Sequence, residues 1–365
     1  MGNFNLFDMT QKMFCKNNLV ATDDAGLPSL LVFIPAFKNS DVLAGGDDNI
    51  HPAFIVNGVQ ISGFFYSKYE NVVYNGKAYS LPAENPKSTV TFDTAREYCE
   101  AKGYGWHMST AAEWAAIALW SKKNGTLPYG NNRYGRDSRE SENKAIPATY
   151  GDDGSIAKVA TGTGPLTWSH DGTASGIWDM NGNNIEWQGG VRVVWGELQI
   201  LANNDAADPD NPQNQTGTCW KAINAADGSL VDPESKTTDS SCKTTGSTVK
   251  LDYVDNVWTY STTITSADNS GRYCLFCDIQ CTANIGDATK LLLRSLALLP
   301  DEGSVAEDYE NDFVYWNNNA MECCVNRGGQ WSHSGGSGVF AILGHFTRAD
   351  TTPSSGFRAA YIPNI

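Results

Sequence analysis

Helical periodicity is confined to a few stretches of this chain, and that confinement is the strongest constraint on its fold. Apolar residues recur at helical spacing in two neighbouring segments, 91–102 and 110–125, and again at 288–299. Thr110 and Glu113 stand at the spacing of a capping box at the start of the second segment. Most of the remaining chain alternates short aromatic runs with Gly, Asn and Asp turns, which is typical of strands. Helices early and strands late predict an α+β fold.

The composition is that of a folded, acidic protein. Of the 365 residues, 41% are hydrophobic and 11% aromatic, which excludes a largely disordered chain. A net charge of −15 repels nucleic-acid phosphates and anionic membranes, so neither is expected as a partner. No apolar run approaches the roughly 18 residues of a membrane span, and the first residues lack the apolar stretch of a signal peptide. We therefore expect synthesis in a cytoplasm, without membrane insertion.

The cysteines indicate a reducing compartment. Nine cysteines, an odd number, without a signal peptide fit this environment better than a disulfide framework. Cys274, Cys277 and Cys281 would suit a metal clip, but no fourth ligand follows at the expected spacing, so ordinary strand or loop cysteines are the favoured interpretation. The tripeptides typical of calcium-dependent sugar sites are absent. We expect no metal and no cofactor.

The chain divides into a short N-terminal segment and one large domain. Residues 1–50 mix short apolar runs with Pro and Gly and form a candidate attachment module, and residues 51–365 form the domain. At 54–70 two apolar runs flank an Asn-Gly dipeptide, which predicts a hairpin. Residues 199–285 are rich in Asn, Asp, Ser and Thr and are interpreted as a loop and strand insertion on the surface.

Four segments resemble, in order, one protein family. They are VTFDTAREYC at 90–99, HMSTAAEWAAIA at 107–118, GIWDMNGNNIEWQ at 176–188, and NRGGQW at 326–331 followed by SGFR at 355–358. Together they resemble the formylglycine-generating-enzyme-like branch of the C-type lectin fold, over residues 54–361. The resemblance implies an α+β, C-type-lectin-like domain of two helices and short antiparallel strands, with an insertion.

The residues that carry this resemblance are interpreted mainly as scaffold. Large apolar side chains among them are expected to be buried, and the glycines to occupy positive-φ turns or close backbone contacts. The charged residues are expected to form buried or half-buried ion pairs. The expected scaffold residues are Glu113, Trp114, Glu186, Trp187, Arg327, Gly328, Gly329, Trp331, Gly356, Phe357 and Arg358.

The resemblance to enzymes of this family stops at the catalytic cysteines. Enzymatic members place a cysteine pair shortly after the Arg-Gly-Gly motif, where it binds copper. Here the stretch after Trp331 contains no cysteine, and Cys323 and Cys324 precede the motif. A related iron-dependent branch needs clustered histidines, whereas this chain has five His and no H-x3-H pair. We expect no catalysis and no catalytic residues.

The C-terminal segment at about 315–355 resembles the variable region of diversity-generating retroelement proteins from phages and bacteria. The fixed part of that pattern is present as RGG at 327–329, Trp331, GVFA at 338–341, Arg348 and GFR at 356–358. In that family a reverse transcriptase diversifies the positions between, and these positions face a ligand. The resemblance assigns this role to Ser332, His333, Gly336, Leu343, His345, Phe346, Thr347, Asp350, Asn317 and Asn318. The alternative, that they are ordinary loop residues, stays open.

The resemblance implies a receptor-binding or adhesin protein. We expect it to be made in a bacterial cytoplasm, encoded by a phage, and placed in the virion tail or otherwise displayed on a surface. The expected partner is a host cell-surface protein or glycan, and a homo-oligomer is compatible with this function. Two alternatives are an oxidoreductase of the formylglycine-generating type and a structural virion or surface protein whose C-terminal loops are buried.

Overall fold

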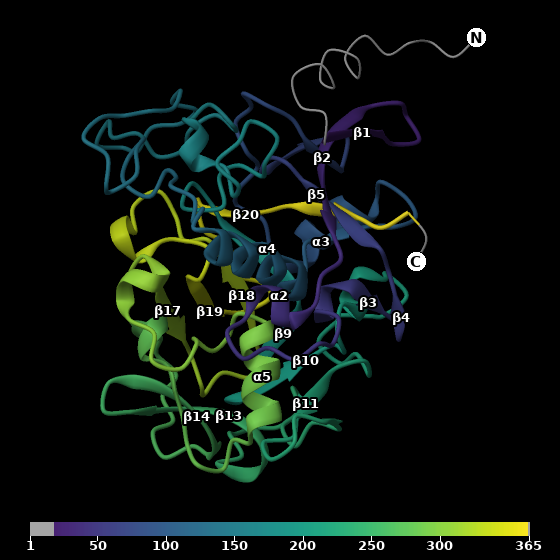
Figure 1. Cartoon of the computed structure of the whole chain (residues 1–365), viewed down its shortest axis with the longest axis vertical. Coiled ribbons are helices and arrows are strands. Elements are labelled where there is room, and N and C mark those ends of the chain that lie inside the picture. The colour runs from purple at the N-terminus through teal and green to yellow at the C-terminus, as the bar shows by residue number, and fades with distance from the viewer. Residues whose placement is uncertain (1–17, 364–365) are drawn as a thin grey trace.

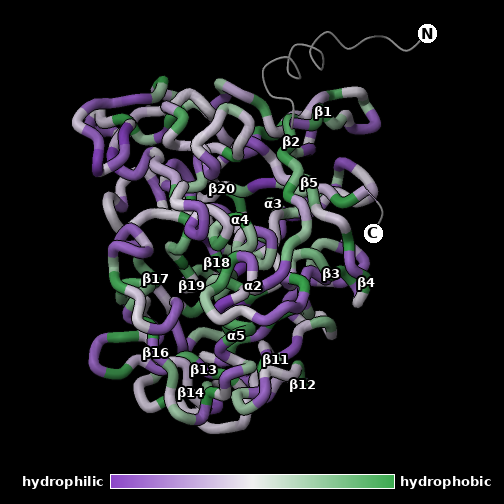
Figure 2. Tube along the Cα trace, viewed as in Figure 1, coloured by the Kyte–Doolittle hydropathy of each residue, from purple (hydrophilic) through white to green (hydrophobic). Residues whose placement is uncertain are grey.

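The computed structural model describes residues 18–363. Within this range the chain forms two large β-sheets, two small hairpins and a few helices (Figure 1). The α-helices described are α2 (Asn39–Val42), α3 (Phe92–Glu100), α4 (Ala111–Asn124) and α5 (Asp287–Ser295). The 3-10 turns are η1 (Pro52–Phe54), η2 (Leu166–Trp168), η3 (Asp205–Ala207), η4 (Phe276–Asp278), η5 (Ala306–Tyr309) and η6 (Ser334–Gly336). Apolar residues follow the central strands, and polar residues dominate the outer loops (Figure 2).

The smaller sheet joins the first and last described strands. Its order is β1 (Asn18–Thr22), β2 (Pro28–Pro35), β5 (Gly63–Ser67), β21 (Ala359–Tyr361) and β8 (Trp106–Met108), all antiparallel. The segment from residue 18 to 35 is thus part of this sheet rather than separate from it. An attachment role for residues 1–50 stays a prediction, and residues 1–17 lie outside the described part of the chain.

The larger sheet has twelve strands and carries the C-terminal segment. Its main path is β15 (Arg272–Leu275), β17 (Phe313–Trp316), β19 (Ile342–Phe346), β18 (Cys323–Arg327), β9 (Ile185–Val194), β10 (Glu197–Ile200), β13 (Thr245–Val254), β14 (Val257–Thr263) and β16 (Gln280–Cys281). β11 (Lys221–Ile223) pairs with β10 and with β12 (Leu230–Val231), and β20 (Ser355–Phe357) pairs with β9. The small hairpins are β3 (Ile55–Val56) with β4 (Val59–Gln60), and β6 (Asn71–Tyr74) with β7 (Lys77–Ser80).

The architecture is a mixed α/β fold with few helices, as predicted, but sheet dominates more than expected. The picture of two helices and short antiparallel strands is wrong in detail. Four α-helices occur within residues 18–363, and β9 and β13 each run for ten residues. Three pairings, β17 with β19, β20 with β9 and β14 with β16, are parallel. Parallel pairing requires a crossover, which short-range sequence patterns do not reveal.

The two early helices are confirmed. The Thr91 side chain caps α3, and Thr110 forms the predicted capping box with Glu113 at the start of α4. α4 ends at Gly125, whose φ of 67° lies in the left-handed region. α4 is buried along most of its length and packs against both the β9 region and the N-terminal elements.

The third predicted helix, at 288–299, is shorter than expected. α5 ends at Ser295, and Ala297 has a φ of 48°, which breaks the helix before Pro300. The carbonyls of Leu296 and Ala297 instead accept hydrogen bonds from Arg327, both at 3.0 Å. Arg327, which is distant in sequence, therefore binds two carbonyl groups that intrahelical hydrogen bonds could have satisfied in a longer helix.

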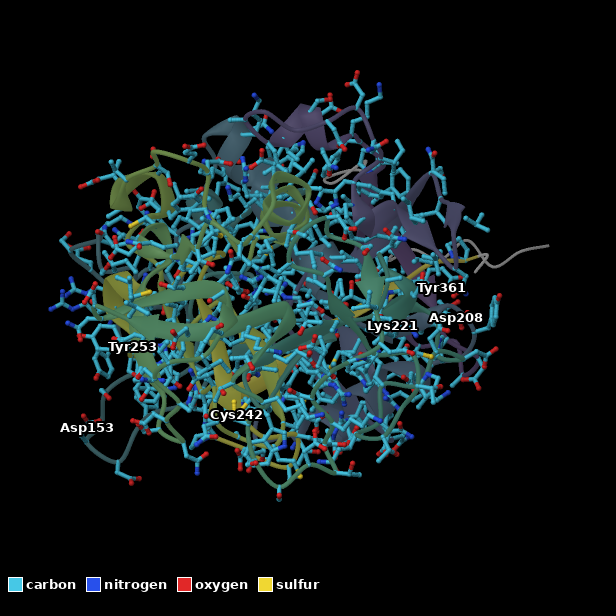
Figure 3. All side chains as sticks on the ribbon, turned by 90° about the horizontal axis from the view of Figure 1, so that it is seen from below. Asp153, Asp208, Lys221, Cys242, Tyr253 and Tyr361 are labelled. Carbon is cyan, nitrogen blue, oxygen red and sulfur yellow. The ribbon has the colours of Figure 1, made fainter. Side chains whose placement is uncertain are left out.

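Residues 199–285 are built into the larger sheet to a greater extent than a surface insertion implies. The expected strand pair is present as β13 and β14, joined by a turn at 255–256 with positive φ. β13 also pairs with β10, and β15 pairs with β17. Trp258 and Tyr260 are fully buried in the main core. Figure 3 views the molecule from this side and labels the half-buried Tyr253 of β13.

The predicted hairpin around the Asn-Gly turn is present but small. Asn57 and Gly58 have φ values of 50° and 75°, as this turn type requires. Only two residues on each side pair, because the following strand β5 joins β2 and β21 instead.

One of the expected buried ion pairs is confirmed. Arg358 Nε lies 2.9 and 2.8 Å from the two carboxylate oxygens of Glu186, and both side chains are fully buried. Glu113 pairs with the imidazole of His107 at 2.8 Å rather than with an arginine. Arg327 donates to backbone carbonyls and forms no ion pair with a described residue, so that expectation is wrong.

The aromatic scaffold residues are buried with one exception. Trp114 and Trp187 are completely buried, and each indole N–H donates to a backbone carbonyl. Phe357 is 1% exposed. Trp331 is only half-buried, and its ring lies 5.5 Å from that of the exposed Tyr134. Trp331 therefore belongs to the surface as well as to the scaffold.

The scaffold glycines are needed for close contacts. Gly328 and Gly329 have φ values of 89° and 73°, and a Cβ on Gly329 would lie 2.2 Å from Ser337 Oγ. A Cβ on Gly356 would lie 2.9 Å from Asn184 Cβ. These contacts hold the turn after β18 and strand β20 tightly against their neighbours.

Arg358→Met is expected to lower the free energy of unfolding by about 3–5 kcal/mol, because Glu186 would remain buried without its cation. Urea denaturation followed by circular dichroism measures this loss. The matched control is Lys221→Met, which removes an exposed partner of Asp232 and should cost less than about 1 kcal/mol. Similar small losses in both variants would contradict a structural role for the buried pair.

Candidate ligand-binding site

A pocket of about 520 Å³ opens beside β17 and β19. Its lining combines aromatic rings, imidazoles and short polar side chains. The lining residues are Ile185, Phe313, Tyr315, Gln330, Trp331, Ser332, His333, Leu343, His345, Phe346, Thr352, Pro353 and Ser354. None of these side chains carries a carboxylate, an ammonium or a guanidinium group.

Strand alternation explains which side chains reach this pocket. β17 and β19 are parallel neighbours, with Tyr315 opposite Leu343. Successive side chains on a strand point to opposite faces. Phe313 and Tyr315 therefore face the pocket, while Val314 and Trp316 between and beside them are fully buried in the core.

Five of the predicted ligand-facing residues meet in this pocket. They are Ser332, His333, Leu343, His345 and Phe346. Two come from the turn after β18 and three from β19, so the structure brings separate segments to one place.

The rings in the pocket pack edge to face. The Phe313 and His333 ring centroids are 5.1 Å apart, and those of Tyr315 and His345 are 4.5 Å apart. His345 also lies 3.9 Å from the ring of Phe346. Such contacts fix ring orientation and leave a stiff, mostly apolar surface.

Both imidazoles in the pocket are held neutral. Burial, with His345 nearby, lowers the pKa of His333 to about 4. Burial also lowers the pKa of His345 to about 4, against the charge of Asp350. The Nδ1 atoms of both rings are buried from solvent, and a hydrogen bond with the Tyr315 backbone acts on the His345 imidazole and opposes the lowering of its pKa. The pocket lining therefore presents both imidazoles as uncharged rings.

A row of polar side chains forms one wall of the pocket. Ser354 Oγ donates to the Gln330 side-chain oxygen, and Gln330 Nε2 donates to Ser332 Oγ at 3.1 Å. Ser337 Oγ also donates to the Gln330 carbonyl at 3.2 Å. These contacts orient the wall before any ligand binds.

Three other predicted positions lie around the pocket without lining it. A Cβ on Gly336 would lie 2.4 Å from the Phe313 ring, so this glycine supports the ring from behind. Thr347 and Asp350 are exposed, and the Asp350 carboxylate accepts the Thr347 N–H at 2.7 Å. They form a turn at the end of β19.

Asn317 and Asn318 do not face the pocket, contrary to the prediction. Asn318 is completely buried, and its amide donates to the carbonyls of Leu251 and Ser266, both at 2.9 Å. Asn317 donates to the Asn269 carbonyl at 3.0 Å. Both side chains tie the turn after β17 to the 251–269 region, and this role needs an asparagine amide.

Eight lining residues are not among the predicted ligand-facing positions. They are Ile185, Phe313, Tyr315, Gln330, Trp331, Thr352, Pro353 and Ser354, of which Trp331 is predicted as scaffold. Alternation along 313–316 was a signal that could have identified Phe313 and Tyr315 as one face. The remaining residues reach the pocket through contacts that are distant in sequence.

No cysteine of the described range lines the pocket. Within residues 18–363 no cluster of three or more His, Cys, Asp and Glu side chains is arranged to hold a metal ion. The eight cysteines in this range are free thiols. Burial raises the pKa of Cys277 and Cys281 to about 11 in each case, which disfavours thiolates there. No helix in the described range is long and apolar enough to cross a membrane.

Comparisons with known proteins give only distant likenesses. No protein-family model and no curated protein sequence match the chain. Among solved structures, the Major Tropism Determinant P3c variant is similar at 11% identity and a TM-score of 0.30, over 94% of this chain and 71% of that one. PvdO from Pseudomonas aeruginosa is similar at 14% identity and a TM-score of 0.33, over 94% and 97% of the two chains. Treponema denticola variable protein 1 is similar at 12% identity and a TM-score of 0.34, over 95% and 99%.

We expect His333 and His345 to stay neutral from pH 8 down to about pH 5. Burial also lowers the pKa of His51 and His170 to about 4, whereas Glu113 raises that of His107 against the effect of burial. Only His107 should therefore titrate above pH 6.5 in an NMR titration of the imidazole protons. Because folding favours the neutral form of the other four, their contribution to stability declines as the pH falls from about 6.5 to 4.

His333→Gln and His345→Gln would assign the two signals. A midpoint near 6.5 for either ring would show that the pocket is more open to water than described.

Proposed function

We propose that this protein is a receptor-binding protein that holds its ligand in the β17–β19 pocket and does not act by catalysis. The convergence of Ser332, His333, Leu343, His345 and Phe346 on one pocket is the observation that carries the proposal. Aromatic and imidazole groups supply contact area, and the neighbouring hydroxyl and amide groups supply adaptable hydrogen bonds.

The scaffold supports exchange of these side chains. Leu343 and His345 project from one face of β19, whereas the completely buried Ile342 projects from the other; Phe346 at the strand end lines the pocket and also packs against Trp187. The preceding turn is fixed by Gly328 and Gly329. A rigid backbone that presents exchangeable side chains is what diversified recognition requires.

The proposal extends to origin and location. We propose a C-type-lectin-like domain encoded by a phage, diversified by a retroelement reverse transcriptase and displayed in the virion tail or on a surface. Its partner would be a surface protein or glycan of a host bacterium. The resemblance of the segment at 315–355 to such variable regions supports this part of the proposal.

An oxidoreductase of the formylglycine-generating type is the alternative function. The cysteines nearest the Arg-Gly-Gly motif are Cys323 and Cys324, which lie on β18 and are at most 1% exposed. Burial raises the pKa of Cys323 to about 12 and that of Cys324 further above its usual value. These buried thiols are poor candidates for thiolate chemistry. A structural virion protein with a buried pocket is the second alternative.

Sequencing the gene across its source population tests diversification. We expect amino-acid substitutions to concentrate at Ser332, His333, Leu343, His345 and Phe346. Gly336, Asn317 and Asn318 should stay constant, because the first supports Phe313 and the other two bind backbone carbonyls. Substitutions spread evenly over the chain, or an invariant pocket, would contradict a diversified binding surface.

Ser332→Trp is expected to fill part of the pocket and to lower binding to host cells by at least about tenfold, a loss of 1.4 kcal/mol or more. Binding of the fluorescently labelled full chain to bacteria from the same source is measured by flow cytometry. Ser241→Trp, at an exposed serine of the 199–285 region, is the matched control and should bind normally. Equal binding by both variants would place the receptor site elsewhere.

A further inference from the structure

The pocket alone favours a particular ligand chemistry. Its imidazoles are uncharged rings, and Ser332, Gln330 and Ser354 form a polar wall of hydroxyl and amide groups. A hydroxyl group can both donate and accept, so it can pair with either kind of group in this wall. A ring that carries hydroxyls around an apolar face matches both this wall and the aromatic rings.

A loop at 130–136 is joined to the edge of the pocket. Tyr134 N–H donates to the Trp331 carbonyl at 2.9 Å, and Ser334 N–H donates to the Asn132 carbonyl at 2.8 Å. The ring of Tyr134 lies against that of Trp331, which lines the pocket. The loop and the pocket are therefore parts of one continuous surface.

This loop presents two arginines. Arg133 N–H donates to the Arg136 carbonyl at 2.8 Å, and Tyr134 between them has a φ of 53°, so the turn is tight. Arg133 is exposed, and its side chain has no hydrogen bond or ion pair with any residue from 18 to 363. Arg136 uses Nη1 to bind the Glu140 carbonyl at 2.7 Å.

The arginines line a second, shallow pocket. It has a volume of about 480 Å³ and also includes Tyr134, Ser141, Glu142 and Asn143. Its lining holds two guanidinium groups and one carboxylate, an excess of one positive charge in the lining itself, on a chain whose net charge is −15. Arg139, which follows this loop, is already paired with Asp137 and Glu310.

We infer that the ligand is an acidic carbohydrate, with a hydroxyl-bearing ring in the β17–β19 pocket and an anionic substituent beside Arg133 and Arg136. This inference rests on the proposed binding function. Guanidinium groups bind the oxygens of carboxylate, sulfate or phosphate through paired hydrogen bonds. The uncharged β17–β19 pocket binds the sugar ring, and Arg133 and Arg136 favour acidic over neutral sugars.

The test uses surface polysaccharide purified from bacteria that bind the full-length protein. Isothermal titration calorimetry compares the native polysaccharide with carboxyl-reduced, desulfated and dephosphorylated forms. We expect binding to the native form and at least about tenfold weaker binding after one of the three treatments. That treatment identifies the anion, and undiminished binding after all three would overturn the inference.

The double variant Arg133→Gln/Arg136→Gln locates the anion. It should bind the native polysaccharide at least about tenfold more weakly and the neutralised form as the unaltered protein does. Lys123→Gln/Lys236→Gln removes the same charge from exposed lysines elsewhere and should bind normally. Equal weakening in both double variants would show that binding responds only to the net charge of the protein, and it would overturn the assignment of the anion to Arg133 and Arg136.

Cell binding of Ser332→Trp and calorimetry on the purified polysaccharide together distinguish failure of the proposed binding function from failure of the carbohydrate inference. If Ser332→Trp abolishes cell binding but purified polysaccharide does not bind, and protease treatment of the cells removes the receptor, the pocket is correct and the carbohydrate inference is wrong. If Ser332→Trp leaves cell binding unchanged, the proposed function itself fails.

Discussion

Arg358 lies where the chain passes from one sheet to the other, and its buried contact with Glu186 is the interaction on which the rest of the arrangement depends. β20, just before it, pairs with β9 in the larger sheet, and β21, just after it, pairs with β5 and β8 in the smaller one. Glu186 belongs to β9, which pairs with β18, and β18 pairs with β19. β19, which carries Leu343, His345 and Phe346 of the pocket, is thus tied to the ion pair through two neighbouring strands.

The placement of charge differs between the scaffold and the pocket. In the scaffold, the buried Arg358 and Glu186 are paired with each other, and the buried Arg327 binds backbone carbonyls. The pocket walls contain no charged side chain, and the charge available to a ligand lies on the adjoining Arg133–Arg136 turn. Exchange of pocket residues therefore leaves the electrostatics of the core unchanged. Because unpaired buried charges are strongly destabilising, this separation allows the surface to vary without loss of the fold.

Features encoded over a few residues could be predicted from the sequence, whereas those that depend on distant partners could not. The capping box at Thr110 and the Asn-Gly turn were correct because their geometry is local. The end of α5 was wrong because Arg327, about thirty residues later, binds the carbonyls that follow it. Asn318 was assigned to the ligand because its partners, Leu251 and Ser266, are far away in sequence. Five of the thirteen lining residues could be predicted because they cluster in one segment.

The alternation along β19 has a consequence for how this surface can evolve. Leu343 and His345 point into the pocket, while Ile342 lies in the core and Gly344 lies against the Trp316 ring. Side-chain identity on the pocket face is therefore free, but strand length is not. β19 already has one residue more than β18 between the pairs Cys324–Phe346 and Asn326–Leu343, so the alternation holds from Ile342 to His345 and breaks before Phe346. An insertion or deletion within 342–345 would exchange the two faces of this segment and force a side chain against Trp316. The fold therefore tolerates substitution of the pocket side chains of β19 but not a change in the number of residues between Ile342 and His345.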